Sequence, residues 1–276
     1  MAGPREAVVV GEGSRALAVV AASAEGDPVA TGSGRKAATA RMGAEALASR
    51  LAAVLGDALA AVVVFGSAAG TEHHAEHSDV NVLVLLSRLG PSELSPSLAA
   101  VVGDWEEAGQ PAPLVMTVAE WRRSADIFPM EVGDVLARHR VLVGSAPFDG
   151  MVVARRDLRL QLEQEAMGKL LRLRGAILTA GGDHERQRQL LARSFSTFMV
   201  LFRAVERLSG ATVPAGNEAL VTAVADRVGF DGAPFLAVAR FRAGGASPAE
   251  PAGLLAGYLR GAEKLAAFLD VFPAGE

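Results

Sequence analysis

Residues 61–86 read AVVVFGSAAGTEHHAEHSDVNVLVLL, and this stretch decides the fold of the N-terminal half. The apolar, β-branched run at 61–65 is typical of a buried strand, and so is the run at 80–86. Gly66 and Ser67 end the first run, and a polar loop leads to the second. The pattern therefore predicts two buried strands with polar residues gathered at the junction between them.

On both sides of this stretch, helical and strand-like segments alternate. Apolar residues at helical spacing predict a helix over 37–55, and Gly56 is a suitable C-terminal stop. An alternation of helices and strands predicts an α/β domain. The remaining expected elements are a helix through 98–105, a strand at 113–117, a short helix at 118–123, an extended segment at 127–132, another short helix and a strand at 140–143.

The second half of the chain has a different period. From Leu158 onward, apolar residues recur three or four apart, and no strand signal follows Ala154. This spacing predicts an antiparallel helical bundle, in which the phenylalanine stripe of the second long helix belongs to the core. The predicted domains are an N-terminal extension at 1–36, an α/β domain at 37–150 and a helical bundle at 151–276.

The junction at residues 66–81 also carries the residues suited to phosphate chemistry. Gly66 lets the backbone approach a triphosphate, and Ser67 can offer a hydroxyl and an N–H to its oxygens. Because residues i and i+2 of a strand share a face, Asp79 and Asn81 are expected to project together toward this loop.

Taken together, Phe65-Gly66-Ser67, eleven intervening residues that end with Ser78, and Asp79-Val80-Asn81 at the start of an apolar strand resemble the signature of the DNA polymerase β-like nucleotidyltransferase superfamily. The resemblance implies a mixed-sheet α/β (α+β) domain and transfer of a nucleotidyl group from a nucleoside triphosphate to a hydroxyl acceptor. It also implies Mg²⁺ or Mn²⁺ held by Asp79 and Asn81, and phosphates held by Gly66 and Ser67. The acceptor can be a small molecule, a protein or an RNA.

The sequence departs from the family pattern at two of three expected carboxylates. Asn81 stands at the second, and Ala112 aligns with the third, on the next core strand. Glu131 or Asp134 can substitute from a neighbouring segment. Two functions therefore stay open: an active nucleotidyltransferase, with Glu131 as a catalytic residue, or a catalytically degenerate fold that binds a nucleotide or a partner.

A narrower resemblance extends into the helical half. The runs Ser124-Ala-Asp-Ile-Phe-Pro-Met-Glu131 and Leu160-Gln-Leu-Glu-Gln-Glu165, with Lys169-Leu-Leu-Arg172, are similar to uncharacterised bacterial nucleotidyltransferase-domain proteins with a C-terminal helical domain. This likeness covers roughly residues 37–208. The first long helix of this half is basic on part of its surface, which makes Lys169 and Arg172 candidate phosphate or acceptor contacts, since ligand sites favour domain interfaces. The alternative is pairing along the helix, Glu165 with Lys169 and Arg159 with Glu163.

A second cluster of polar residues fills the predicted loop. His73, His74 and His77 lie among acidic residues and can bind zinc or nickel, but structural zinc sites need four ligands, which favours a solvated loop.

The composition of the chain excludes several kinds of chemistry and of binding partner. The chain of 276 residues has no cysteine, which excludes disulfides and thiolate chemistry, and its net charge of -4 gives no general attraction to nucleic acid. The lack of a signal sequence or a long apolar run predicts a cytoplasmic protein without membrane spans. Base preference and oligomeric state are left open.

Overall fold

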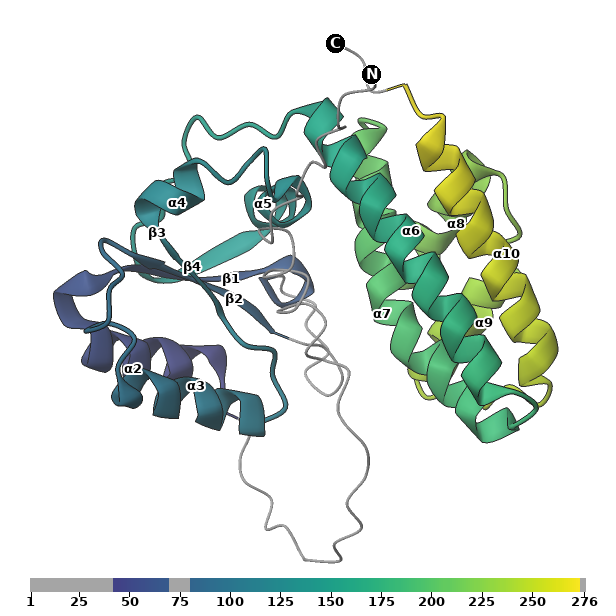
Figure 1. The fold of residues 1–276 in the computed structure, drawn as a ribbon, viewed down its shortest axis with the longest axis horizontal. Coiled ribbons are helices and arrows are strands. Elements are labelled where there is room, and N and C mark those ends of the chain that lie inside the picture. The colour runs from purple at the N-terminus through teal and green to yellow at the C-terminus, as the bar shows by residue number, and fades with distance from the viewer. Residues whose placement is uncertain (1–41, 70–79, 274–276) are drawn as a thin grey trace, which may run out of the picture. The chain divides into compact units, whose positions relative to one another are not determined.

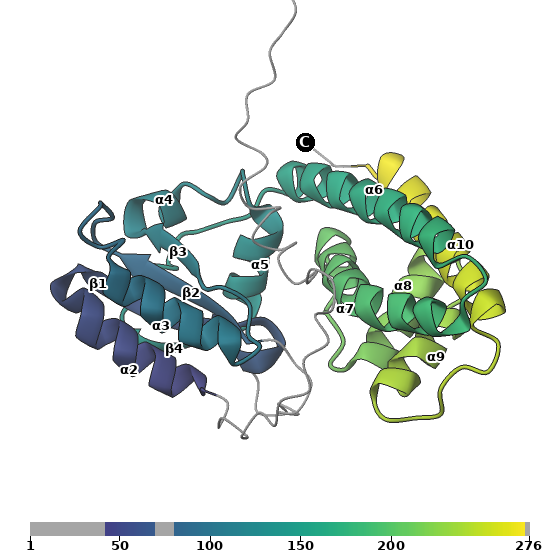
Figure 2. The same cartoon turned by 60° about the horizontal axis from the view of Figure 1, so that its bottom comes forward.

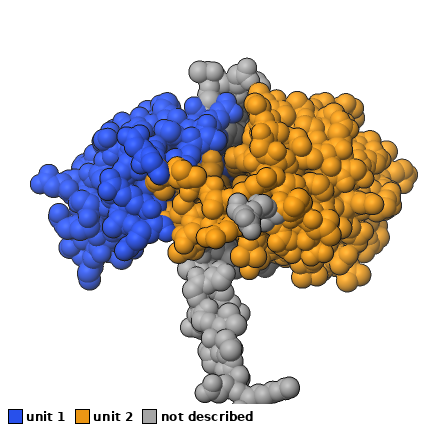
Figure 3. Space-filling view, turned by 90° about the horizontal axis from the view of Figure 1, so that it is seen from above, with its two compact units in different colours: residues 1–123, 134–150 blue, residues 124–133, 151–276 orange. Residues whose placement is uncertain are grey.

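The computed structural model describes residues 42–69 and 80–273, with the backbone alone at Ser67. These residues form two compact units (Figure 3). Unit 1 contains a four-stranded sheet with its covering helices, and unit 2 is helical. Within the described residues, unit 1 consists of 42–69, 80–123 and 134–150, and unit 2 consists of 124–133 and 151–273.

The sheet of unit 1 is mixed, with strand order β3-β2-β1-β4 (Figure 1). The central strand β1 runs antiparallel to β2 on one side and to β4 on the other, whereas β2 and β3 are parallel. All four strands predicted from the sequence are present. Their bounds are β1 Leu59–Phe65, β2 Asn81–Leu86, β3 Leu114–Thr117 and β4 His139–Gly144.

Both faces of the central strands are covered, which explains why β1 and β2 read as unbroken apolar runs. Helices α2 (Ala44–Leu55) and α3 (Pro96–Glu107) pack on one face (Figures 1 and 2), where Leu47, Leu51 and Trp105 meet the valines of β1 and β2. The short helix α4 (Val118–Arg122) packs against β2 and β3.

Helix α4 begins with a capping box. Thr117 Oγ1 accepts from the Glu120 backbone N–H, and the Glu120 carboxylate accepts from the Thr117 N–H. This backbone hydrogen bond is the main cause that lowers the pKa of Glu120. A short sequence, Thr-Val-Ala-Glu, thus ends β3 and starts a helix at once.

The segment predicted to be extended at 127–132 is a turn at 127–128 followed by the start of helix α5 (Pro129–Ala137), so that prediction is wrong. Proline presets the backbone dihedral of a first helical turn, and the Val132 N–H donates to the Phe128 carbonyl at 3.0 Å. Met130 and Val132 are both buried, on one helix. The first part of α5 also belongs to unit 2, so residues 124–133 depart from the predicted domain limits.

After Gly144, every regular element of the described residues is a helix. No helix within 42–69 and 80–273 has the length and apolarity needed to cross a bilayer. The helices of unit 2 are α6 Arg155–Ala180, α7 His184–Leu208, α8 Asn217–Val228, α9 Ala233–Arg242 and α10 Pro251–Asp270.

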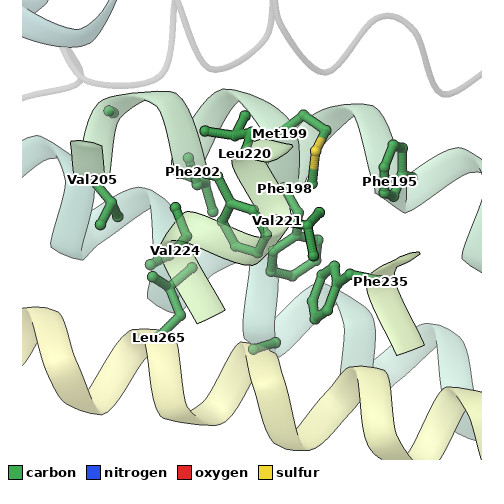
Figure 4. Close-up of a cluster of buried hydrophobic side chains, with 14 of the residues drawn as sticks. Phe195, Phe198, Met199, Phe202, Val205, Leu220, Val221, Val224, Phe235 and Leu265 are labelled. Atoms are coloured by element: carbon green, nitrogen blue, oxygen red, sulfur yellow. The ribbon is translucent and has the colours of Figure 1, made fainter. Parts of the chain in front are cut away.

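The phenylalanine stripe of α7 is the centre of the unit 2 core (Figure 4). Phe198 makes edge-to-face contacts with Phe202, Phe235 and Tyr258, and Phe235 stacks on Tyr258 with ring centroids 3.9 Å apart. Burial raises the pKa of the Tyr258 hydroxyl, although the nearby Ser194 hydroxyl partly offsets the effect. These side chains are fully packed against protein, which confirms the reading of the stripe as core.

Helices α7 and α8 are joined by a partly buried ion pair. The Glu206 side chain is only 2% exposed and accepts two hydrogen bonds from Arg227, at 2.9 and 3.0 Å. These hydrogen bonds raise the pKa of the Arg227 guanidinium above its usual value. Glu206 is therefore compatible with the core only while Arg227 is present.

We expect Arg227→Ala to lower the free energy of unfolding by about 3 kcal/mol, because it leaves a buried carboxylate unpaired. Arg240→Ala is the matched control, since its ion pair with Glu218 is exposed on both sides and worth at most about 0.5 kcal/mol. Urea denaturation of the two variants tests the difference, and equal losses would contradict the account.

Gly144 ends β4 at a point where no side chain fits. Its φ is +74°, and a Cβ atom would lie 1.9 Å from the carbonyl oxygen of Ala60 on β1. Gly150 has a similar φ of +75° but open space around it. The two glycines thus share a positive φ, and only Gly144 has a neighbouring atom that a Cβ would meet.

Gly144→Ala should therefore cost at least about 3 kcal/mol of stability, against about 1 kcal/mol for Gly150→Ala. Thermal or urea unfolding of both variants measures this. A Gly144→Ala protein as stable as Gly150→Ala would show that β4 does not approach β1 so closely.

Candidate functional site

The candidate site lies where β1 ends and β2 begins. Gly66 follows β1 with a φ of +74° and opens a single 3-10 turn, Gly66–Ala69. Its N–H donates to the Arg138 carbonyl at 3.0 Å, which continues the pairing of β1 with β4 by one more bond. The start of the turn is therefore held by the sheet itself.

Asn81 is brought to this turn by strand register. It pairs with Phe65, the last residue of β1, so it lies directly beside Gly66. A Cβ atom on Gly66 would lie 3.6 Å from Asn81 Nδ2. The glycine thus leaves the approach to the Asn81 amide open, and that amide offers both a donor and an acceptor to a ligand.

The entry into β2 is fixed by a residue that the sequence analysis did not select. Gln110 Oε1 accepts a hydrogen bond of 2.8 Å from the Val80 N–H. Gln110 follows Gly109, whose φ of +83° turns the chain out of α3. The sequence did show a polar residue, Gln110, directly after a glycine turn. Its hydrogen-bond partner, Val80, is thirty residues away in sequence, so the contact could not be predicted from spacing.

The third expected carboxylate is absent from the neighbouring strand. Strands β2 and β3 are in parallel register, with Leu83 beside Leu114. Extending this register by two residues toward the start of both strands places Ala112 beside Asn81. β3 itself carries no acid, and Ala112, the position aligned with the third carboxylate from sequence, carries none either.

His139 is a second residue that the sequence analysis missed. It pairs with Phe65 on the opposite side of β1 from Asn81, so the side chains of Asn81 and His139 share one face of the sheet. Its Nδ1 lies 2.7 Å from the Val135 carbonyl oxygen. Because a carbonyl only accepts, Nδ1 carries the proton and Nε2 keeps its lone pair in the neutral ring.

Several predicted site residues lie outside the described residues. Asp79 and the loop histidines His73, His74 and His77 fall in 70–79, and Ser67 is described by its backbone alone. Within the described part of the chain, no group of three or more His, Asp or Glu side chains is arranged to hold a metal. Asp79 therefore remains the one predicted carboxylate ligand, on sequence grounds.

Glu131 is placed on helix α5 and not on an extended segment. Its carboxylate accepts a 2.9 Å hydrogen bond from Gln161 Nε2, and Gln161 Oε1 accepts one of 2.8 Å from the Met130 N–H. One glutamine side chain thus ties α5 to α6 within unit 2. This structural role was not expected from the sequence.

Lys169 and Arg172 lie on α6, in unit 2, and their part in a shared nucleotide site stays a prediction. Lys169 Nζ is 3.7 Å from Glu165, and Arg159 is 3.0 Å from Glu163, so both helical pairings expected from the sequence are present. The Arg172 side chain is exposed.

Unit 2 also has a small cavity of about 290 Å³ where α6 starts and α7 ends. Arg155 and Arg207 contribute to its lining. The Arg155 Nε donates to the Leu208 carbonyl at 2.9 Å, and its guanidinium lies over the Phe272 ring. Arg155 thus serves to close the C-terminal end of α7.

Compared with known protein families and with curated proteins, the chain finds no match. The assignment of a function therefore depends on the residues at the end of β1 and the start of β2.

The contact between Gly66 and Asn81 can be tested by adding one methyl group. Gly66→Ala and the control Gly56→Ala both place alanine at positive φ, a conformation that strains a residue with a side chain. Gly56 has open space around it. We expect only Gly66→Ala to shift the Asn81 side-chain amide in ¹H–¹⁵N NMR spectra, and an unmoved signal would remove Gly66 from the site.

Proposed function

We propose that this chain binds a magnesium nucleoside triphosphate on a nucleotidyltransferase-type domain, with nucleotidyl transfer weak or lost. The observation that carries the proposal is the placement of Asn81 against the Gly66 turn. A glycine turn after one strand and polar ligands at the start of its antiparallel neighbour form the pattern that the superfamily resemblance implies.

Each residue has a distinct part in binding. Gly66 gives phosphate oxygens access to the backbone, and Ser67 adds a hydroxyl and an N–H. Asp79 supplies the carboxylate for Mg²⁺, and the Asn81 amide oxygen is a neutral second ligand. Such a set fits Mg²⁺, which commonly takes one or two protein ligands and completes its shell with phosphate oxygens and water.

The same residues argue against efficient transfer. Two-metal catalysis of nucleotidyl transfer would need concentrated negative charge from the protein to hold both ions. Here Asn81 removes one charge, and Ala112, which aligns in sequence with the third expected carboxylate, supplies none. A bound metal would neutralise the phosphates, and neither Asn81 nor Ala112 offers a carboxylate for a second metal ion.

Active transfer to a hydroxyl acceptor is the second candidate. It requires a further acid at the site, and Glu131 or Asp134 is the available source on α5. For Glu131 that role means exchanging its hydrogen bond to Gln161 for a metal. His139, which shares the sheet face of Asn81, can accept a proton at Nε2 but supplies no negative charge.

Isothermal calorimetry with magnesium and a nucleoside triphosphate tests the proposal. Asp79→Ala should abolish metal-dependent nucleotide binding, whereas Asn81→Asp should tighten it by roughly tenfold, equivalent to about 1.4 kcal/mol for the added charge. Asp57→Ala, at an exposed site in the same unit, is the control and should bind as the wild type does.

The same proteins incubated with labelled triphosphate, alone and with candidate acceptors, separate the two functions. We expect little or no transferred label with the wild type. Rapid labelling that is lost in Glu131→Gln would establish the active enzyme instead. Nucleotide binding that survives Asp79→Ala would show that the strand junction is not the nucleotide site.

A further inference from the structure

Helix α6 has two apolar faces, and only one of them is buried. The buried face packs into the core of unit 2 through residues such as Leu162, Leu170 and Leu173. A second set of large apolar side chains points to solvent. Its members and their exposed fractions are Leu160 57%, Met167 46%, Leu171 58% and Leu178 84%.

These four residues belong to a regular stripe along the helix. With Gln164 and Arg174 they are spaced four and three residues apart in alternation, which is the a/d spacing of a coiled-coil seam. All six positions are exposed. We call this set the α6 stripe; it consists of Leu160, Gln164, Met167, Leu171, Arg174 and Leu178.

The α6 stripe is symmetric about its centre. Read from either end, it runs apolar, polar, apolar, apolar, polar, apolar. In an antiparallel pair of α6 helices centred at Lys169, Leu160 meets the other copy's Leu178, and Met167 meets the other copy's Leu171. The two polar positions meet each other, Gln164 against Arg174.

Charge favours this antiparallel pairing over the parallel one. A parallel pair in register would set the Arg174 side chains of two copies against each other. In the antiparallel pair each guanidinium meets an amide oxygen that can accept from it. Arg174 already donates to Glu263 of α10 at 2.8 Å, and its remaining donors can reach Gln164 of a second copy.

We propose that a second copy of this chain covers the α6 stripe, in a two-fold symmetric dimer with antiparallel α6 helices. The interface is isologous, so the same patch serves both subunits, which is the commonest form of protein dimer. Helix α6 has 26 residues and is about 39 Å long, enough for all six layers. A polar layer within an apolar seam fixes the register at some expense of stability.

The α6 stripe is independent of the proposed nucleotide site in unit 1. Lys169 and Arg172, the two α6 residues predicted to contact phosphate, are not among its six members. The dimer can therefore be tested without reference to nucleotide binding.

Light scattering after gel filtration of the full chain gives the first test. We expect a dimer at micromolar concentration, and a monomer for Leu171→Glu. Leu94→Glu is the matched control, because Leu94 is exposed to a similar extent, at 63%, and lies in unit 1. Thermal unfolding should show both variants folded.

A monomeric wild type overturns the proposal, whether the α6 stripe is solvated or covered by another part of the same chain. A dimer that Leu171→Glu leaves intact also overturns it.

Cysteine cross-linking tests the direction of the helices, since the chain contains no cysteine of its own. Leu160→Cys/Leu178→Cys should form a covalent dimer on mild oxidation. Each single variant should not, because identical residues of the two antiparallel helices lie about 27 Å apart at these positions. Cross-linking of the single variants in place of the double variant means parallel helices, and overturns the proposed interface.

Discussion

The antiparallel pairing of β1 with β2 is the constraint on which the candidate site depends. It sets Asn81 opposite Phe65 and therefore beside Gly66, and it does so with two strands that are buried on both faces. Backbone hydrogen bonds on both edges of β1 hold this register, because β4 pairs with the other edge. A shift of one residue would turn Asn81 to the opposite face and separate it from the turn. The sheet register thus determines which side chains lie together at the site.

Much of this sheet was predictable from the sequence, because buried strands leave a local signal. The runs at β1 and β2 have no competing helical period, and Gly66 marks their junction. The start of α5 was not predictable in the same way. Met130 and Val132 alternate as in a strand, and only the helix that Pro129 begins, with its tie to Gln161, settles their conformation. The local sequence pattern was therefore misleading at the start of α5, where tertiary contacts determine the conformation.

The site itself was predictable in its glycine turn and strand ends, and not in its surroundings. Gln110 holds the Val80 N–H from another element, and His139 reaches the face of Asn81 through the register of β4. Neither contact could be predicted from the spacing of the residues in the sequence. Helix α6 shows the same limit, since its apolar residues were assigned to one core face and include a second, exposed one. Apolar residues spaced three and four apart identify a helix, but they do not show how many of its faces pack against other helices.

The central claim of this account is that the β1–β2 junction binds a nucleotide through a metal. Backbone NMR of the full chain, titrated with a non-hydrolysable triphosphate in the presence and absence of Mg²⁺, tests it most directly. The account predicts that the Gly66 and Asn81 amides shift together, and that they shift only when Mg²⁺ is present. Unchanged Gly66 and Asn81 signals at saturating ligand, or shifts there that do not depend on Mg²⁺, would contradict it.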